Sequence, residues 1–201
     1  YNGRETAPMG ASETMFLDAQ GNPMDFYQAV ASGRSVGVPG LVGLLARVHR
    51  DYGRLDWARL FEPAIALAES GFPVSRRLHD LLVEYEMETW PDAARAYFYP
   101  GGEAPPVGYR LVNPAYATTL RRIARDGASV FYTGAIAQDI VDAAGSDPLP
   151  GSLSIDDFAD YAVFRKPPVC APYRRYLICG MGPPSSGGVS TLQILGVLEN
   201  F

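Results

Sequence analysis

The amino-acid sequence predicts an α+β chain that is mostly helical, with two or three strands. Apolar residues recur at helical spacing between residues 39 and 144, and short polar or glycine-rich segments separate these stretches. After Tyr161 the apolar period shifts toward two, which is typical of strands. With 201 residues, of which 47% are hydrophobic and 19% charged, the chain has the ordinary composition of a globular protein.

The beginning of the chain differs from the helical region that follows it. Residues 1–36 carry little helical periodicity, and their glycines and prolines predict a short strand followed by loops. A first amphipathic helix is predicted from Leu41 to Tyr52, because large apolar side chains recur there at intervals of three and four. Gly53 follows at the place where helices commonly end.

The later helices are predicted from the same periodicity together with their start residues. Pro63 marks the first turn of a new helix, Ser75 and Asn113 are typical caps, and Ser154 opens a capping box. The predicted helices comprise residues 57–70, 75–85, 114–127 and 134–144, a short helix after Ser154, and a last helix through Leu192, Leu195, Leu198 and Phe201.

The strands are predicted near the end of the chain. Ala162–Arg165 and Tyr173–Cys179 show the alternating pattern of strands. Residues 100–112 predict an exposed loop, with a short hairpin as an alternative. Pro183–Gly188 interrupts the pattern before the last helix. Its prolines stiffen the chain, its serine hydroxyls suit turn or helix-start amides, and its glycine pair permits close packing.

The composition excludes several classes of partner. The net charge of -5 argues against a nucleic-acid surface, and no run of 18 apolar residues predicts a membrane span. We also expect no cofactor and no metal site, because no phosphate-binding loop or metal-ligand spacing is present. Since the chain begins at Tyr1 and ends at Phe201 within a helical pattern, both ends are expected to be cuts or processing points, through which a targeting segment could have been lost.

The cysteines and histidines are expected to be structural. Cys170 and Cys179 lie nine residues apart. A disulfide between them is possible, but two buried thiols are the expectation. His49 and His79 lie among charged neighbours on predicted helices, so both are expected at the surface.

Two pairs of polar residues resemble catalytic groups but have a simpler explanation. Ser185 and Ser186 are expected to belong to a turn, because a nucleophilic serine needs a base and an orienting partner. Asp156 and Asp157 fall in the first turn of a helix, where they complement the helix dipole. Neither pair is predicted to be catalytic.

Arg4 is the candidate binding residue. Taken alone, an Arg beside Glu5 near a chain end predicts a surface ion pair. However, Gly3–Pro8 (GRETAP) resembles the substrate-binding strand of γ-glutamyltransferases, and the resemblance continues in order along nearly the whole chain. The other segments that resemble this family are Val36–Gly40, Tyr52-Gly53, Glu62–Phe72, Phe131–Gly134, Asp156-Asp157 with Tyr161, Tyr173–Tyr176, Pro183–Gly188 and Leu198–Phe201.

The resemblance implies a specific fold and reaction. The family has the four-layer αββα core of N-terminal nucleophile hydrolases, and its precursor cuts itself into a large and a small subunit. The Thr exposed by that cut attacks the γ-glutamyl amide, with its own α-amine as the base. The γ-glutamyl group of glutathione or another γ-glutamyl amide then passes to water or to an amino-acid or peptide acceptor. At the position of Arg4 the family binds the α-carboxylate of the substrate, and Glu5 and Thr6 are weaker candidates for supporting it.

The resemblance also implies what this chain does not contain. Residues 1–201 correspond to part of the large subunit, so the N-terminal part and the small subunit with the nucleophilic Thr are expected to be absent. No catalytic residue is therefore assigned here, and the chain alone is expected to be inactive. Gly187-Gly188 is not the oxyanion-hole glycine pair, which belongs to the small subunit. The family is mostly periplasmic, secreted or surface-bound, so a periplasmic or secreted location is expected.

Two alternatives stay open at this point. One is a relative with the same fold and another acyl specificity, such as a cephalosporin (glutaryl) acylase or a poly-γ-glutamate-processing enzyme. The other is a non-catalytic homologue or fragment that serves only as a scaffold. Keeping Arg4 favours a substrate that bears an α-carboxylate, but a glutaryl acylase can also place an Arg nearby.

Overall fold

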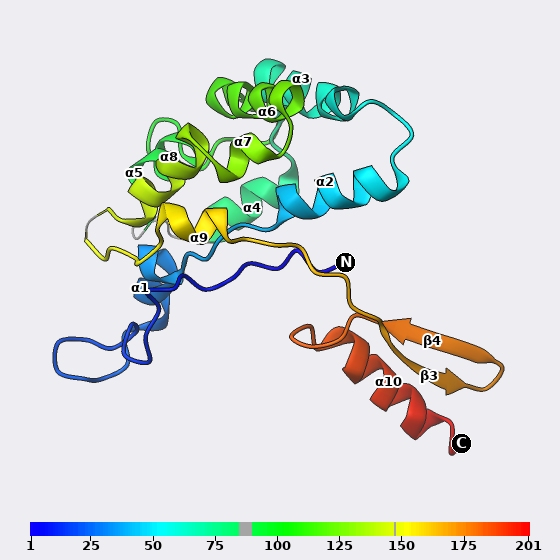
Figure 1. Cartoon of the computed structure of the whole chain (residues 1–201). Coiled ribbons are helices and arrows are strands. Elements are labelled where there is room, and N and C mark those ends of the chain that lie inside the picture. Colours follow the sequence, from blue (N-terminus) through cyan, green and yellow to red (C-terminus); the bar gives the residue numbers. More distant parts are fainter. Residues whose placement is uncertain (85–89, 147) are drawn as a thin grey trace. The chain divides into compact units, whose positions relative to one another are not determined.

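The computed structural model describes residues 1–84, 90–146 and 148–201. Within these ranges the chain forms two compact units, which are described separately here. The larger unit is Gly3–Val163, and the smaller one consists of Tyr1–Asn2 together with Phe164–Phe201. Figure 1 shows that helices dominate the larger unit and that the smaller one is a hairpin with one helix, which confirms the predicted α+β class.

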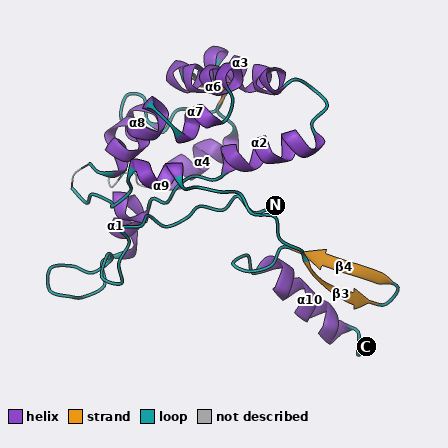
Figure 2. Ribbon diagram, in the orientation of Figure 1, coloured by secondary structure: helices purple, strands orange, loops and turns teal. Residues whose placement is uncertain are grey.

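The larger unit is built from helices with very little strand (Figure 2). Its only named strands in the described ranges are β1 (Phe72–Pro73) and β2 (Arg110–Leu111), which pair antiparallel. Its helices are α1 (Phe26–Ala31), η1 (Gly33–Ser35), α2 (Leu41–Tyr52), η2 (Trp57–Phe61), α3 (Glu62–Ser70), α4 (Arg76–Glu84), α5 (Asp92–Phe98), α6 (Pro114–Asp126), α7 (Ser129–Tyr132), α8 (Ala135–Ala144) and α9 (Ile155–Ala159), where η marks a 3₁₀ helix.

The helices begin and end at the residues that the sequence marks. Helix α3 has Pro63 in its first turn and ends before Gly71, whose φ of +75° favours glycine. The Asn113 side chain accepts a hydrogen bond from the backbone N–H of Tyr116 at the start of α6. Ser154 and Asp157 form a complete capping box at α9. These predicted helices are therefore confirmed, although Tyr85, assigned to the helix that starts after Ser75, lies outside the described residues.

The core of the larger unit lies around Phe158. This side chain is 1% exposed and packs with the rings of Phe131 and Tyr132. The buried residues of this cluster are Val38, Ala137, Ala144, Leu153 and Phe158. A second buried row, formed by Ala117, Leu120 and Ile123, runs along α6. The indole N–H of Trp57 in η2 donates to the Ile123 carbonyl oxygen at 3.0 Å, which joins η2 to α6.

The larger unit differs from the prediction at several places. The short strand predicted within residues 1–36 is reduced to isolated bridges, such as that between Thr6 and Val38. Helices α1 and α5 were not predicted, because six or seven residues are too few to display a helical period. The alternative of a hairpin within residues 100–112 is also wrong. Arg110–Leu111 pairs instead with Phe72–Pro73, so the partner strand lies almost 40 positions earlier in the chain.

The smaller unit is a hairpin covered by one helix. Strands β3 (Val169–Tyr173) and β4 (Tyr176–Gly180) pair antiparallel, and α10 (Gly187–Leu198) packs against both. The predicted strand Tyr173–Cys179 is therefore wrong in its start, because Arg174 and Arg175 form the turn between two strands. The predicted strand Ala162–Arg165 is reduced to a single bridge between Phe164 and Asn2.

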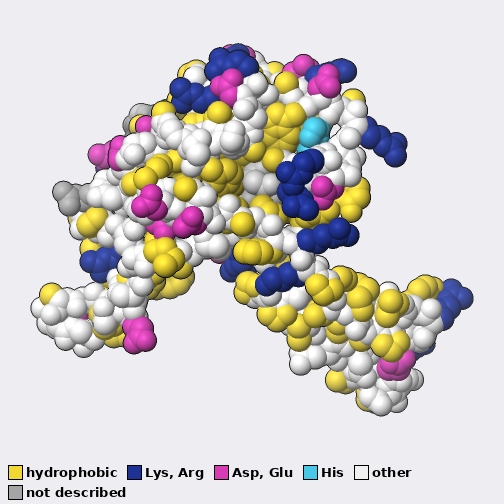
Figure 3. Space-filling view, in the orientation of Figure 1, with side chains coloured by type: hydrophobic (Ala, Val, Ile, Leu, Met, Phe, Trp, Pro, Cys, Tyr) yellow, Lys and Arg dark blue, Asp and Glu magenta, His cyan; other side chains and the backbone are white. Residues whose placement is uncertain are grey.

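The smaller unit has no enclosed core of its own. Its residues are all described, and none of them is buried. Hydrophobic side chains instead gather on its surface in Figure 3. The most exposed of these are Leu177, Ile194, Val197 and Phe201. Separately, no helix in the described ranges is long and apolar enough to cross a membrane.

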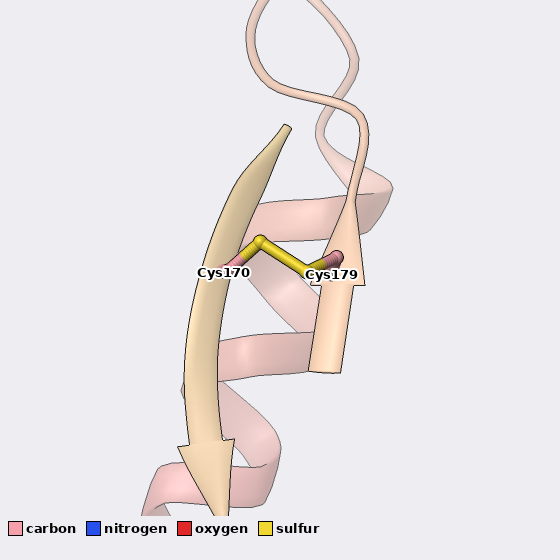
Figure 4. The surroundings of a disulfide bond; sticks show 2 residues. All are labelled: Cys170 and Cys179. Carbon is pink, nitrogen blue, oxygen red and sulfur yellow. A yellow bond between two sulfur atoms is a disulfide. The ribbon is translucent and has the colours of Figure 1, made fainter. Parts of the chain in front are cut away.

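A disulfide joins the two strands of the hairpin (Figure 4). Cys170 and Cys179 lie directly opposite each other in the strand register, with their Cα atoms 4.2 Å apart. Both residues are exposed. The expectation of two buried thiols is therefore wrong, because the tight turn after Tyr173 places the two cysteines side by side at the surface.

Candidate functional site

The segment that contains Arg4 runs in extended form beside the chain that leads into α2. Thr6 and Val38 form an antiparallel bridge, in which the Val38 N–H donates to the Thr6 carbonyl oxygen at 2.9 Å. Val38 itself is fully buried. One edge of residues 3–6 is thus fixed to the core of the larger unit through backbone hydrogen bonding.

Glycines permit the close approach of these two segments. A Cβ atom on Gly40 would overlap both the Gly3 carbonyl oxygen and the Tyr161 hydroxyl. A Cβ atom on Gly37 would lie 2.7 Å from the Thr6 carbonyl oxygen, which is closer than real Cβ atoms come to such neighbours. Because backbone meets backbone here, glycine is required on the α2 side of the contact.

An aromatic pair supports the same segment from α7 and the chain after α9. The Tyr161 hydroxyl donates to the carbonyl oxygen of Arg4 at 3.0 Å. Its ring stacks on that of Tyr132, with centroids 5.4 Å apart and an interplanar angle of 3°. The Tyr132 hydroxyl accepts the Gly43 N–H and donates to the Pro39 carbonyl oxygen, both at 2.9 Å. The two tyrosines therefore link Arg4 to the first turn of α2.

Both hydroxyls stay protonated at neutral pH. Burial raises the pKa of Tyr132 above that of an ordinary tyrosine, although the hydrogen bond from Gly43 opposes this effect. Burial and the negative charge of Glu5 both raise the pKa of Tyr161. Each hydroxyl is therefore a hydrogen-bond donor at neutral and mildly alkaline pH.

The side chain of Arg4 lies at the surface. Its Nε atom is 3.2 Å from Glu5 Oε1, and the two side chains are 54% and 58% exposed. This geometry confirms the surface ion pair that the sequence predicts. An exposed pair of this kind contributes little stability. The guanidinium can therefore exchange this contact for another carboxylate at low cost, and its planar fork suits such a group.

The two serines after the proline pair lie in a turn, as predicted. The Ser185 N–H donates to the Gly182 carbonyl oxygen, and Ser186 precedes the first turn of α10 without a side-chain capping bond. The predicted use of its hydroxyl at the helix start is therefore wrong. The glycine pair does serve close packing, because a Cβ atom on Gly188 would overlap the Met181 carbonyl oxygen.

The two histidines are half-buried rather than at the surface. His49 Nε2 lies 2.8 Å from the Leu55 carbonyl oxygen, and His79 Nδ1 lies 2.9 Å from the Pro105 carbonyl oxygen. Each ring thus holds a loop against its helix, which the helical pattern around it does not predict. Within the described ranges, no group of three or more His, Cys, Asp or Glu side chains could hold a metal ion.

Tyr132 and Tyr161 are the residues that sequence reasoning missed as part of this site. Both occur in segments that resemble the family, but neither carries a local signal of its contact with another segment. The hydrogen bond from Tyr161 reaches a residue 157 positions away. Only the folded arrangement brings it to Arg4.

Comparisons with known proteins show which family the whole chain is similar to. The family model described as Gamma-glutamyltranspeptidase matches residues 1–201. Among curated relatives, the glutathione hydrolase proenzyme of Escherichia coli (strain K12) is 37% identical over 200 residues, which cover 98% of this chain and 34% of the relative. The chain spans about a third of the length of the curated relatives it matches.

Solved structures show the same likeness. The gamma-glutamyltranspeptidase of Helicobacter pylori is 36% identical with a TM-score of 0.89, covering 99% of this chain and 57% of that chain. A cephalosporin acylase from Bacillus halodurans is 29% identical with a TM-score of 0.75, covering 100% of this chain and 38% of that chain. Because the family model matches every residue from 1 to 201, the chain belongs to the gamma-glutamyltranspeptidase family.

Proposed function

We propose that this chain is part of the large subunit of an enzyme that transfers or hydrolyses γ-glutamyl groups, with glutathione among its substrates. The observation that supports it most directly is the segment of residues 3–6, which backbone hydrogen bonds hold in place and which carries the exposed guanidinium of Arg4. The family to which the chain belongs uses such an arginine for the substrate. The complete protein would have the four-layer αββα core of N-terminal nucleophile hydrolases.

In this proposal Arg4 binds the α-carboxylate of the γ-glutamyl group. Two parallel charge-assisted hydrogen bonds from a guanidinium fix both the position and the orientation of a carboxylate. Binding at this end of the substrate holds the distant γ-carbonyl in place for attack, which lowers the entropic cost of the reaction. Glu5 keeps the guanidinium near the strand until the substrate replaces it.

The chemistry itself is assigned to a small subunit of the same precursor. Its N-terminal Thr attacks the γ-carbonyl carbon, the amide C–N bond breaks, and the leaving amine takes the proton that the Thr hydroxyl gave to the α-amine. The γ-glutamyl ester then passes to water or to the amine of an amino acid or peptide. Residues 1–201 supply binding and no nucleophile.

Processing of the full-length protein tests the reaction class. We expect intact mass and N-terminal sequencing to find two chains, one beginning with Thr, and γ-glutamyl-p-nitroanilide to release nitroaniline. A single uncut and inactive chain would favour the alternative of a non-catalytic scaffold. Two chains without release would favour another acyl group.

An Arg4→Ala variant of the full-length protein tests the carboxylate contact. We expect kcat/KM for γ-glutamyl-p-nitroanilide to fall by about 30- to 1,000-fold, mainly through KM, because one partner of a charge-assisted pair is lost. The matched control is Arg47→Ala, which removes another surface arginine paired with a carboxylate, Asp51. An Arg4→Ala enzyme with the KM of the parent would rule out this role.

A second candidate is an acylase for a group that lacks the α-amino group, such as glutaryl. The likeness to the cephalosporin acylase supports keeping it. Hydrolysis of glutaryl-p-nitroanilide in preference to the γ-glutamyl compound would favour this candidate. Arg4 does not separate the two candidates, because glutaryl lacks only the α-amino group and keeps a carboxylate at the position of the γ-glutamyl α-carboxylate.

The exposed disulfide supports an exported protein. Disulfides persist in the periplasm and outside the cell, whereas cytosolic thiols are kept reduced. We therefore assign the enzyme to the periplasm or the medium. Cell fractionation with an alkylating thiol label tests it, because Cys170 and Cys179 should resist labelling until a reductant is added.

A further inference from the structure

The direction of the Arg4 side chain depends on the backbone from which it leaves. Its carbonyl group and its side chain share one Cα atom, so rotation of the following peptide plane changes where the guanidinium points. The Thr6 to Val38 hydrogen bond fixes the segment two residues further on. At residue 4 itself, the Tyr161 hydroxyl holds the carbonyl oxygen at 3.0 Å.

Tyr161 is itself held in a defined position. Its ring lies parallel to that of Tyr132, and the Tyr132 hydroxyl bonds to both Pro39 and Gly43 at the start of α2. Tyr132 also packs on the buried ring of Phe158. The Tyr161 hydroxyl therefore holds residues 3–6 in a fixed position relative to the core, while the charged side chains of this segment are exposed.

We propose that Tyr161 is a positioning residue for substrate binding, which acts by fixing the Arg4 carbonyl group and thereby the orientation of the Arg4 guanidinium. This inference rests on the proposed function, in which Arg4 binds the α-carboxylate. Tyr161 does not contact the substrate. Its effect is specific to the carboxylate end and is absent for substrates that lack this group.

The chemistry of the hydroxyl suits this role. Both burial and the charge of Glu5 raise the pKa of Tyr161, so the group remains a donor to the carbonyl oxygen at neutral and mildly alkaline pH. Gly40 permits the contact, since any Cβ atom there would overlap the hydroxyl. A Phe at position 161 keeps the ring stack and removes only the hydrogen bond.

The test compares Tyr161→Phe with Tyr99→Phe in the full-length processed enzyme. For Tyr161→Phe we expect KM for γ-glutamyl-p-nitroanilide to rise about 3- to 10-fold, with kcat changed less than about 2-fold, as loss of one hydrogen bond implies. For 4-aminobutyryl-p-nitroanilide, which lacks the α-carboxylate, we expect no change in kcat/KM. Tyr99→Phe removes a hydroxyl that donates to the Leu82 carbonyl oxygen at 2.6 Å, so it should lower the melting temperature and leave KM near that of the parent.

A double-mutant cycle separates positioning from a general structural effect. Once Arg4 is Ala, the further change Tyr161→Phe should leave KM unchanged, because no guanidinium remains to be oriented. An equal rise in KM in the presence and absence of Arg4 overturns the proposal, and so does an unchanged KM for Tyr161→Phe alone. A rise of the same size in Tyr99→Phe also overturns it, since loss of any tyrosine hydroxyl in the larger unit would then be responsible.

The same experiment distinguishes this proposal from the proposed function. If Arg4→Ala alone leaves KM unchanged, the carboxylate contact is wrong and the positioning role is overturned with it. If Arg4→Ala raises KM strongly while Tyr161→Phe does not, the proposed function stands and only the positioning role is lost.

Discussion

Asp157 and Met9 are joined by a hydrogen bond of 2.7 Å, in which the Met9 N–H donates to Asp157 Oδ1, although 148 positions separate them. The other carboxylate oxygen accepts the N–H and the hydroxyl of Ser154 at 2.8 and 2.7 Å. Asp157 is 6% exposed. The acid that the sequence assigns only to a helix dipole thus also ties the N-terminal loop to α9.

Replacing this acid is expected to destabilise the larger unit. Asp157→Ala removes the carboxylate half of the capping box at α9 and leaves the Met9 N–H without its acceptor, so we expect a loss of about 2–4 kcal/mol in the free energy of unfolding. Asp156→Ala is the matched control, because Asp156 lies exposed in the same turn and should change stability by less than about 0.5 kcal/mol. Urea denaturation of the full-length protein measures both. Equal losses in the two variants would contradict the long-range role.

The pH dependence of this contribution has a defined sign. Burial raises the pKa of Asp157, but the hydrogen bonds from Met9 and Ser154 lower it by more, so the pKa in the folded state lies below that of an ordinary Asp. The stabilisation is therefore complete above the unfolded-state pKa of about 3.9 and is lost as the pH falls through the lower folded-state value.

A comparison of the parent with Asp157→Asn isolates this effect. The difference in their unfolding free energies should be constant from pH 7 to about pH 5 and should shrink below about pH 4. Urea titrations at successive pH values measure it. A difference that shrinks instead as the pH rises from 5 to 7 would contradict the assigned direction of the shift.

Reduction of the disulfide is expected to loosen the smaller unit selectively. No described residue of this unit is buried, so the Cys170–Cys179 bridge supplies a large share of its order. Closing a loop of about ten residues contributes about 2–3 kcal/mol. In reduced protein, or with both cysteines replaced by Ser, hydrogen exchange of the β3 and β4 amides should accelerate by about 30- to 100-fold.

Helix α6 provides the internal control for this experiment. Its buried row, Ala117, Leu120 and Ile123, lies in the larger unit. Its amides should exchange at the same rate with and without reductant. Unchanged exchange in β3 and β4 would mean that packing, and not the bridge, holds the hairpin.

A methyl group at Gly40 is expected to disturb the Arg4 strand. Gly40→Ala forces a Cβ atom onto the Gly3 carbonyl oxygen and the Tyr161 hydroxyl, so we expect a loss of about 1–3 kcal/mol in stability together with a raised KM. Gly196→Ala is the control, because nothing lies within 4 Å of that position in the middle of α10. It should be neutral or stabilising by up to about 1 kcal/mol. Thermal unfolding and steady-state kinetics measure both variants. A Gly40→Ala enzyme with the KM of the parent would contradict the role of this close contact in holding residues 3–6.

The helices could be predicted because their signals are local. The period of apolar residues from Leu41 to Tyr52, the Pro63 start and the Ser154 capping box all act within a few residues. The hairpin turn could not be predicted, because its two residues, Arg174 and Arg175, are not the Gly or Asn that usually mark tight turns. Arg174 adopts a φ of +52° without such a signal. Because this turn was not predicted, the pairing of the two cysteines across it was not predicted either.

The support of the candidate site could not be predicted for a different reason. Arg4 is found by resemblance, but its neighbours come from residues 36–40, from Tyr132 and from Tyr161. These contacts join residues that lie more than 30 and up to 157 positions apart, so they leave no periodic pattern in the sequence. Only the packing of α7, α8 and α9 around Phe158 brings these residues together.

The way in which residues 3–6 are held also places different constraints on the backbone contacts and on the exposed side chains of this segment. Backbone atoms and glycines hold the strand, while the side chains of Arg4 and Glu5 are more than half exposed. A new side chain at position 4 is therefore expected to affect folding little, whereas almost any new side chain at Gly40 is expected to destabilise the fold. Under the proposed role of Arg4, acyl-group preference would therefore change through single substitutions on an unchanged backbone.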